Sequence, residues 1–237
     1  HTVSLRSRVS TIQRRALFNY FAPQIRGMEK LDLSLSALFD ESRDIRTFSA
    51  RRWEGSLQFV QRYTLSKSLF YRFSYRRVSV SDVKIQPELI PRLSQPARVG
   101  MPSVGYVDDR RDDPVDSRKG TYNSLDLGVA SKYFGSEADF SRLLGRNSTY
   151  HPLGSKLVLA RTFLFGWIHT VRRNPDLPPG EQDIPLPERF FAGGATTHRG
   201  FPENQAGPRD LLTGFPIGGK ALLVLGHEIR FPLYGAN

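Results

Sequence analysis

Apolar and polar residues alternate with a period of two along much of this chain, and that alternation constrains the fold more than any other feature. Residues 30 to 39, KLDLSLSALF, carry one set at Leu31, Leu33, Leu35, Ala37 and Phe39 and the other at Asp32, Ser34, Ser36 and Leu38. A helix would scatter both sets around its circumference, whereas a strand places them on opposite faces. The pattern therefore predicts β-strands with one apolar face.

Ten such segments follow one another, and no convincing amphipathic helix separates them. We place them at residues 3–12, 14–25, 30–39, 53–65, 69–80, 98–107, 120–134, 139–151, 156–169 and 220–233. Short connections, such as TLSKS and HPLGSK, alternate with long polar ones: DESRDIRTF, the Pro-rich IQPELIPRLSQP and residues 172–219. Short turns at one end and long loops at the other are typical of a bacterial outer-membrane barrel.

The composition is compatible with that fold and leaves two alternatives open. No run approaches the roughly 18 to 20 apolar residues of a membrane-spanning helix, but a barrel hides its apolar face in any window average. The net charge of +11 invites a nucleic-acid reading, although the arginines are scattered and no recognition motif appears. A soluble β-sandwich would need its apolar faces to meet each other. The absence of cysteine excludes disulfides and thiolate metal sites.

Motifs for catalysis and for metal binding are missing from the sequence. The five histidines stand singly, at positions 1, 151, 169, 198 and 227, without the paired spacing that zinc needs. The acidic cluster of residues 108–116 lacks the spacing, glycine and closing glutamate of a calcium loop, and arginines are interleaved with its carboxylates. There is no nucleophile elbow, Walker loop or dinucleotide fingerprint. We therefore predict no enzyme, no catalytic residue, no metal and no cofactor.

Three passages together resemble the BamA/TamA-type superfamily of outer-membrane protein assembly factors, the bacterial surface antigen barrels. They are AGGATTHRGF at 192–201, GGKALLVLGHEIRFPL at 218–233 and DDRRDDPVDSRKG at 108–120. The chain departs from the family at His198, where an aliphatic residue is usual, and at Ser117, where proline is common. Within that family, the resemblance implies an all-β fold: a transmembrane antiparallel β-barrel, incomplete, with about ten strands of sixteen.

The resemblance also assigns parts of the chain. Residues 1–237 would be a partial barrel domain comprising approximately strands three to twelve, with two strands before, four after and the POTRA domains outside it. Residues 172–219 would be the long sixth extracellular loop, whose tip folds back inside the barrel. The loop motif would be His198, Arg199, Gly200 and Phe201, the acidic lumen partner Glu228, and the periplasmic turn Asp109, Arg111, Asp112, Pro114 and Gly120.

The residue chemistry suggests how the loop motif works. A guanidinium holds a carboxylate through a planar fork of donors, which lysine lacks. Our hypothesis is that Arg199 pairs across the lumen with Glu228 and pins the loop to the wall. Gly193 and Gly194 would let the loop backbone turn tightly beside that wall.

The resemblance implies a protein that inserts or translocates other proteins in the bacterial, Gram-negative outer membrane. Its partners would be the lipid bilayer, unfolded outer-membrane protein clients and, in addition, periplasmic chaperones or accessory lipoproteins, with no nucleic acid. Client strands would add to a weakly paired seam by β-augmentation. Three alternatives stay open: a secretion pore for a single partner, a passive outer-membrane channel, and a soluble basic β-domain that binds nucleic acid.

Overall fold

The computed structural model describes residues 1–43, 45–91, 97–171 and 184–232, and within them ten strands form. The strands are β1 (Thr2–Val9), β2 (Gln13–Ala22), β3 (Leu31–Ser42), β4 (Ser49–Arg62), β5 (Lys67–Ser81), β6 (Ala97–Asp109), β7 (Gly120–Ala130), β8 (Phe140–Leu153), β9 (Leu157–Thr170) and β10 (Ala221–Arg230). Four 3-10 turns accompany them: η1 (Ile25–Gly27), η2 (Pro87–Leu89), η4 (Lys132–Phe134) and η5 (Leu186–Glu188). In these described ranges, no helix is long and apolar enough to cross a membrane. The predicted all-β class and the ten segments are confirmed.

Several predicted strand ends were wrong, each for a local reason. The second segment ends at Ala22 instead of residue 25, because Gln24 has a φ of 54° and starts the turn η1. The seventh ends at Ala130 instead of residue 134, where the Ser131 side chain accepts a hydrogen bond from the backbone N–H of Tyr133 and begins η4. β4 starts four residues before the predicted segment, and β10 ends at Arg230, while position 233 lies outside the described residues.

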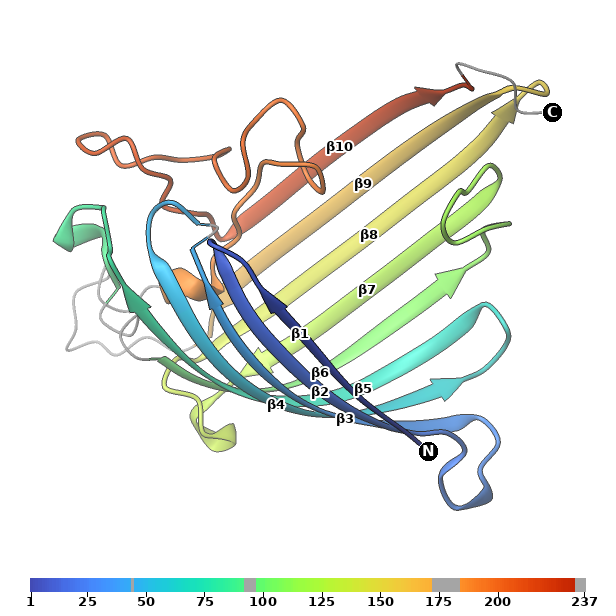
Figure 1. Cartoon of the computed structure of the whole chain (residues 1–237), viewed down its shortest axis with the longest axis horizontal. Helices are drawn as coiled ribbons and strands as arrows, with labels where there is room; N and C mark the ends of the chain where they lie inside the picture. Colours follow the sequence, from blue (N-terminus) through green and yellow to red (C-terminus); the bar gives the residue numbers. More distant parts are fainter. Residues whose placement is uncertain (44, 92–96, 172–183, 233–237) are drawn as a thin grey trace.

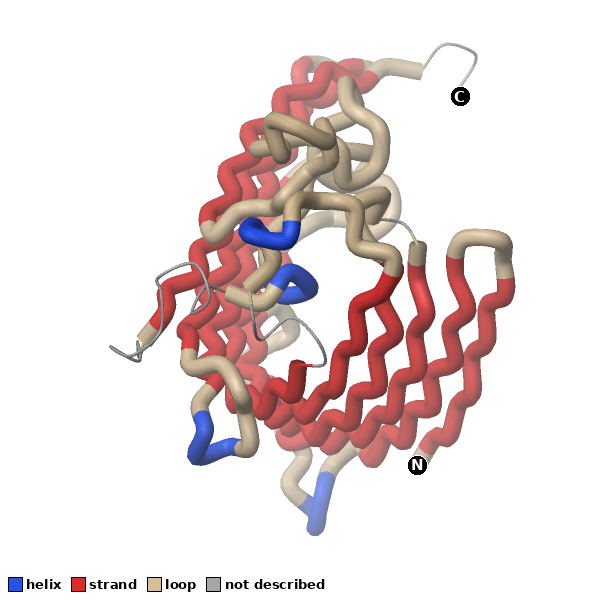
Figure 2. Tube along the Cα trace, turned by 90° about the vertical axis from the view of Figure 1, so that its left-hand side faces the viewer, coloured by secondary structure: helices blue, strands red, loops and turns tan. Residues whose placement is uncertain are grey.

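The ten strands form one antiparallel sheet in sequence order, from β1 to β10 (Figure 1). The sheet curls into an open half-barrel, with β1 and β10 at its two edges. The described residues of five connections lie at one end, here called the long-loop end: those within 10–12, 43–48, 82–91, 131–139, and 171 with 184–220. The other four connections, 23–30, 63–66, 110–119 and 154–156, lie at the other end, the short-turn end. Figure 2 shows that loop segments occupy much of the concave side.

Apolar side chains cover the convex face, which is the reverse of a water-soluble sheet protein. Leu223 and Leu225 of β10 are 63% and 65% exposed, and Trp53, Tyr71 and Phe163 are likewise exposed on other strands. The described residues form a single sheet, so no second sheet covers these side chains. An exposed apolar face of this extent is suited to lipid. The soluble sandwich kept open above is therefore wrong.

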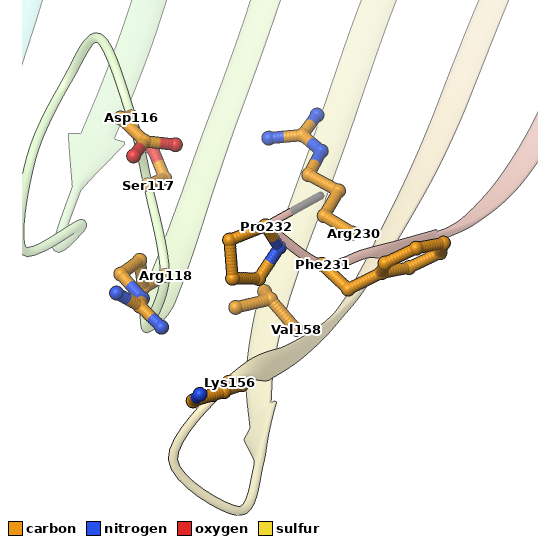
Figure 3. Close-up of a pocket in the computed structure, with 8 residues that line it drawn as sticks. All are labelled: Asp116, Ser117, Arg118, Lys156, Val158, Arg230, Phe231 and Pro232. Carbon is orange, nitrogen blue, oxygen red and sulfur yellow. The ribbon is translucent and has the colours of Figure 1, made fainter. Parts of the chain in front are cut away.

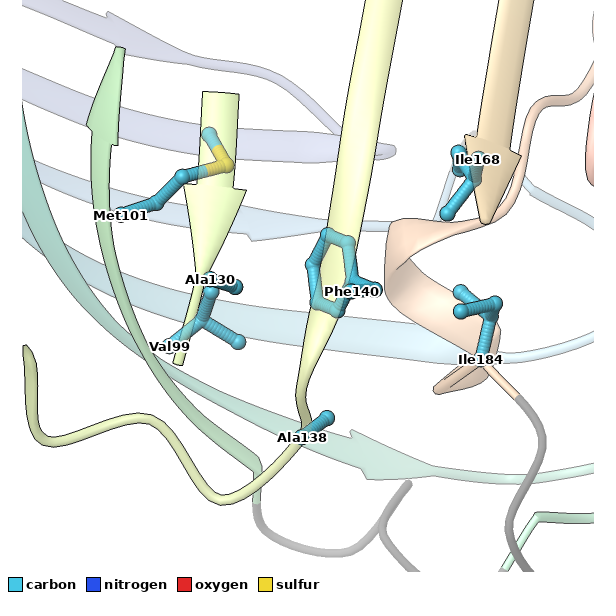
Figure 4. Packing of buried hydrophobic residues seen from close by; sticks show 7 residues of the cluster. All are labelled: Val99, Met101, Ala130, Ala138, Phe140, Ile168 and Ile184. Atoms are coloured by element: carbon cyan, nitrogen blue, oxygen red, sulfur yellow. The ribbon is translucent and has the colours of Figure 1, made fainter. Parts of the chain in front are cut away.

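The concave face holds two buried apolar clusters, both at the long-loop end. The first joins β6 to β9 through Val99, Met101, Ala130, Ala138, Phe140, Ile168 and Ile184 (Figure 4). The second joins Val80, at the end of β5, to Phe48, Ile85 and Leu186 of three connections. Ile184 and Leu186 come from the connection between β9 and β10, whose described part, residues 184–220, is called the inner loop below. The sheet thus gains its core by folding this loop into its own hollow.

The ladder between β6 and β7 is shorter than either strand. It runs from Ser103–Gly128 to Asp109–Tyr122, although β6 begins at Ala97. The ladder stops beside Pro102, which has no backbone N–H to donate. Beyond that point, the backbone N–H of Glu137 donates to the carbonyl of Arg98 at 2.9 Å. The sheet is therefore joined at this position partly by a connection instead of by strand pairing.

Candidate functional site

The inner loop is an ordered structure inside the half-barrel. Its two arms meet at Phe190 and Gly219, which exchange backbone hydrogen bonds of 2.9 and 2.8 Å. Further bridges join Ala192 to Ala206 and Arg209 to Pro216. Residues 184–220 form no regular strand, and these isolated bridges satisfy part of their backbone hydrogen bonding.

The tip of the inner loop brings Arg199 to Glu228. The Arg199 Nη2 atom lies 3.2 Å from Glu228 Oε1, and the two side chains are 70% and 37% exposed. Arg230 lies 3.3 Å from the other carboxylate oxygen of Glu228. Glu228 is the seventh residue after the start of β10, so the contact lies about 24 Å along the wall from the long-loop end. The two residues named from the sequence therefore meet, with both side chains partly exposed in the half-barrel.

The rest of the motif shapes the tip. The Gly200 N–H donates to Nδ1 of His198 at 3.2 Å, and the rings of His198 and Phe201 meet edge to face with centroids 4.9 Å apart. The backbone N–H of Gly194 donates to the carbonyl of Phe201 at 2.9 Å. Phe201 is 45% exposed, so its ring shields the tip instead of filling a pocket.

Gly193 and Gly194 have backbone conformations that favour glycine. Gly193 has a φ of 116°, and a Cβ there would lie 2.2 Å from the carbonyl oxygen of Pro202. Gly194 has a φ of 84°, and a Cβ there would overlap the Glu203 carboxylate. Both conformations are disfavoured for residues with a side chain. The glycine pair is therefore required by the turn that starts the tip.

A second ion pair, which the sequence did not reveal, is buried at the base of the inner loop. Glu188 of η5 accepts from Arg76 of β5 in a bidentate arrangement, with Nε to Oε1 at 2.8 Å and Nη2 to Oε2 beside it. The side chains of Arg76 and Glu188 are 6% and 3% exposed. Glu188 is the first residue of the ERFF stretch, and an acidic residue at this position could have suggested an ion pair. No sequence pattern near Glu188 identified Arg76 as its partner.

Aromatic packing fixes the same base to the far side of the wall. The guanidinium of Arg142 on β8 lies 5.4 Å from the ring centroid of Phe190. Phe190 also lies against Gly166 of β9, where a Cβ would come within 2.7 Å of the ring. Gly166 therefore leaves the space that the ring occupies. From Glu188 to Phe190, the loop thus contacts β5, β8 and β9.

Asp210 ties the inner loop to the connection between β5 and β6. Its carboxylate accepts from the backbone and side-chain nitrogens of Gln86 at 2.9 and 2.7 Å, from the Leu212 N–H at 3.0 Å and from the Thr213 hydroxyl at 2.7 Å. Burial opposes ionisation of Asp210, but the hydrogen bonds from Thr213 and Gln86 outweigh it and lower the pKa of the carboxyl below its ordinary value. In the same region, Thr47 donates to the Pro216 carbonyl.

The acidic segment predicted as a turn lies at the short-turn end, toward which the Arg199–Glu228 contact is also placed, and among the described residues it makes no ion pair with Arg199. Arg111 forms a bidentate pair with Asp109, both bonds being 2.8 Å, and donates to the Pro114 carbonyl at 3.2 Å. Gly120 begins β7. Asp112 accepts from the backbone N–H groups of residues 113, 118 and 119, and that of Lys119 contributes most to lowering the pKa of this carboxyl. These carboxylates stabilise the turn by local hydrogen bonds.

A basic hollow of about 250 Å³ lies beside this turn. It is lined by three segments and shown in Figure 3: Asp116, Ser117, Arg118, Lys156, Val158, Arg230, Phe231 and Pro232. Arg118 donates to the Ser155 carbonyl at 3.0 Å, which joins two short turns. Arg230 faces both this hollow and Glu228, so the short-turn end is connected to the loop contact through one arginine.

Two known proteins are similar to this chain, one in sequence and one in fold. The chain is 25% identical over 174 residues to a SAM50-like protein of Schizosaccharomyces pombe, covering 72% of this chain and 34% of that protein. It shares the fold of a crystal structure of BamA from Haemophilus ducreyi lacking POTRA domains 1–3, with a TM-score of 0.80 and 15% identity over 97% of this chain and 47% of that one. The chain thus spans less than half the length of either protein.

The family model matches the whole chain. The Omp85 superfamily domain covers residues 1–237, in agreement with the curled antiparallel sheet, its apolar convex face and the loop in its hollow. The resemblance stated from the sequence motifs is thereby confirmed, as is the partial transmembrane β-barrel that it implied. The chain belongs to the Omp85 superfamily.

Proposed function

We propose that this chain forms part of the barrel of an outer-membrane protein that inserts or translocates other proteins, and that its inner loop holds the barrel wall in one conformation. The observation that carries the proposal is the loop motif in the hollow, with Arg199 on Glu228 of β10. The same loop is anchored at its base on β5, β8 and β9. A loop held at both places limits how far these strands move apart.

The setting of this activity is also part of the proposal. The matched relatives come from a fungus and a bacterium, so the bacterial outer membrane predicted from the sequence stays a proposal, as do the POTRA domains. The clients would be unfolded outer-membrane proteins, and accessory lipoproteins or periplasmic chaperones would deliver them. Edge-strand pairing supplies the recognition, because backbone hydrogen bonds add a strand without depending on client sequence.

The test is a client-folding assay with the full-length protein in liposomes. An unfolded outer-membrane protein is added, and its folded fraction is followed by heat-dependent migration in gels. Because the Arg199–Glu228 pair is exposed, Arg199→Ala removes about 1 kcal/mol or less, so the folding rate should fall by up to about fivefold. Arg146→Ala is the matched control, since Arg146 is an exposed arginine of the concave face on β8.

Two outcomes would contradict the proposal in different ways. If the Arg199→Glu, Glu228→Arg double variant performs no better than either single variant, the ion pair does not hold the loop. If the wild-type protein conducts ions across the liposome but folds no client, the passive channel replaces the assembly function. A protein that exports one partner and folds no other client would be the single-partner secretion pore.

A further inference from the structure

The convex face carries a groove of about 460 Å³ across β1 to β5. Its floor is made by small residues: Ala37 and Gly55 are direct cross-strand partners, and a Cβ at Gly55 would meet nothing within 4 Å. Its walls are the exposed aromatic rings of Phe18, Trp53 and Tyr75. The groove therefore lies where small residues stand between large aromatic ones, on the face that the barrel turns to lipid.

The walls are arranged by neighbouring strands. Trp53 lies beside Phe39 with ring centroids 4.5 Å apart, and the two are register partners on β4 and β3. Tyr75 is the register partner of Gly55 on the next strand. Because each ring stands on a paired strand, the groove is held open by the sheet itself.

One end of the groove is closed by a cation. Arg77 lines it, as the register partner of Trp53, and its guanidinium has no hydrogen-bond or ion-pair partner among the described residues. Two other arginines of the same face do have carboxylates: Arg51 lies 3.7 Å from Glu41, and Arg98 lies 2.8 Å from Glu137. Arg77 is thus a free guanidinium beside an apolar groove.

The position of Arg77 indicates the depth of this end in the membrane. It is four residues before the end of β5 at the long-loop end, about 14 Å along the strand. Its flexible side chain reaches the headgroup level from there while the groove continues toward the hydrocarbon. A ligand that matches both parts has an apolar chain and an anionic head.

We propose that this groove binds one acyl chain of a membrane lipid whose phosphate is held by Arg77. A guanidinium forms paired hydrogen bonds with phosphate oxygens, and the groove volume is within the range of roughly 300 to 1,000 Å³ of small-ligand sites. A membrane segment of a partner protein would fill the apolar part but would leave the cation without a counter-charge. The proposal depends on the transmembrane fold and not on the proposed assembly function.

The tryptophans of the chain provide the test. The chain contains two, Trp53 in the groove wall and Trp167 on the convex face of β9. Full-length protein with Trp53 as its sole tryptophan is placed in phosphatidylcholine bilayers that contain brominated phosphatidic acid, whose chains quench tryptophan on contact. We expect the site beside Trp53 to prefer brominated phosphatidic acid to brominated phosphatidylcholine by about fivefold. This is the effect that one arginine near the membrane surface has on the binding of an anionic lipid. A protein with Trp167 as its sole tryptophan should show no such selection.

Two variants separate the contribution of the lipid headgroup from that of the acyl chain. Arg77→Gln should abolish the preference for phosphatidic acid while Trp53 is still quenched by brominated lipid. Arg161→Gln is the control and should leave the preference unchanged, because Arg161 is an exposed arginine elsewhere on the convex face, on β9. Gly55→Leu should fill the groove and reduce quenching of Trp53 by both lipids. Gly145→Leu is its matched control on β8, because a Cβ there makes only an ordinary contact, 3.5 Å from Leu125.

The proposal is overturned if Trp53 and Trp167 show the same lipid selection, or if Arg77→Gln leaves the selection unchanged. It is also overturned if a photo-crosslinker placed at position 55 in native membranes captures a polypeptide and no lipid. That result would assign the groove to a membrane segment of a partner protein.

Discussion

Replacing Glu188 by alanine should release the inner loop far more than any change at the Arg199 tip. The substitution leaves Arg76 buried in the wall, 6% exposed, with both donors of its former bidentate contact unpaired. A buried charge without its partner is strongly unfavourable, whereas an exposed one is solvated by water. The buried pair at the base therefore governs whether the loop stays in the hollow.

The size of the effect follows from burial. Removing one partner of a buried pair costs about 3 to 5 kcal/mol, which corresponds to an increase in loop opening of roughly 10²- to 4 × 10³-fold. Arg199 is 70% exposed in its contact with Glu228, so Arg199→Ala should cost about 1 kcal/mol or less, or up to about fivefold. The two variants should differ by at least one order of magnitude.

Thiol labelling measures the opening directly. The chain has no cysteine, and Gln205 of the inner loop is 6% exposed with its Nε2 atom unpaired among the described residues. Gln205→Cys therefore places a buried thiol in the loop without removing a side-chain hydrogen bond of that amide. The labelling rate in this background, divided by the rate in the denatured protein, gives the opening equilibrium for each variant.

If Glu188→Ala raises the labelling rate by less than Arg199→Ala does, the buried pair does not govern whether the loop stays in the hollow. An Arg76→Met, Glu188→Met double variant serves as the control, because it removes both charges and leaves apolar side chains in the buried site. It should recover much of the protection, since such replacements of buried pairs are often neutral. Failure of recovery with normal barrel folding would mean that the pair acts through shape and not through charge.

Two further predictions use the same reporter. Gly193→Ala should open the loop tip, because a Cβ at this position is opposed both by the φ of 116° and by the Pro202 carbonyl oxygen 2.2 Å away. Gly207→Ala is the control: its φ is 114°, but a Cβ there meets nothing within 4 Å, so it should show the conformational strain alone. Equal effects of the two variants would exclude the clash with Pro202 as a cause. Asp210 has a lowered pKa in the folded loop, so its contribution is present above the unfolded pKa of about 3.9 and is lost as pH falls toward the folded pKa. Labelling with 4,4′-dithiodipyridine, which reacts with thiols in acid, should rise over that range, and Asp210→Asn should flatten the pH dependence; an unchanged profile would contradict the assignment.

The strands were predictable from the sequence because their cause is local. Alternation in residues 30–39 reports directly which side chains face lipid, and Leu35 is exposed on the convex face as that pattern requires. Strand ends were less predictable, since the turn at Gln24 and the cap at Ser131 depend on single backbone conformations. The ten-strand sheet needed no information beyond the period and the loop lengths.

The candidate site was predictable only where a motif marked it. Arg199 and Glu228 belong to recognisable passages, and the structure brings them within 3.2 Å. Arg76 and Glu188 are 112 positions apart, and no spacing rule connects them. Arg76 and Arg77 are adjacent and alike in sequence, yet the first is buried against the loop and the second faces outward. The strand period places them on opposite faces of β5, but only the placement of the inner loop shows that Arg76 is buried against Glu188.

Because the ladder between β6 and β7 is short, the inner loop also holds two parts of the sheet together. With pairing absent before Ser103, the wall resembles two panels joined by a partial hinge, β1 to β6 on one side and β7 to β10 on the other. Glu188 is attached to the first panel at Arg76, and Phe190, two residues later, rests on Arg142 of the second. These few residues therefore act as a brace across the hinge, and cutting it would let the panels flex against each other while every strand remained folded.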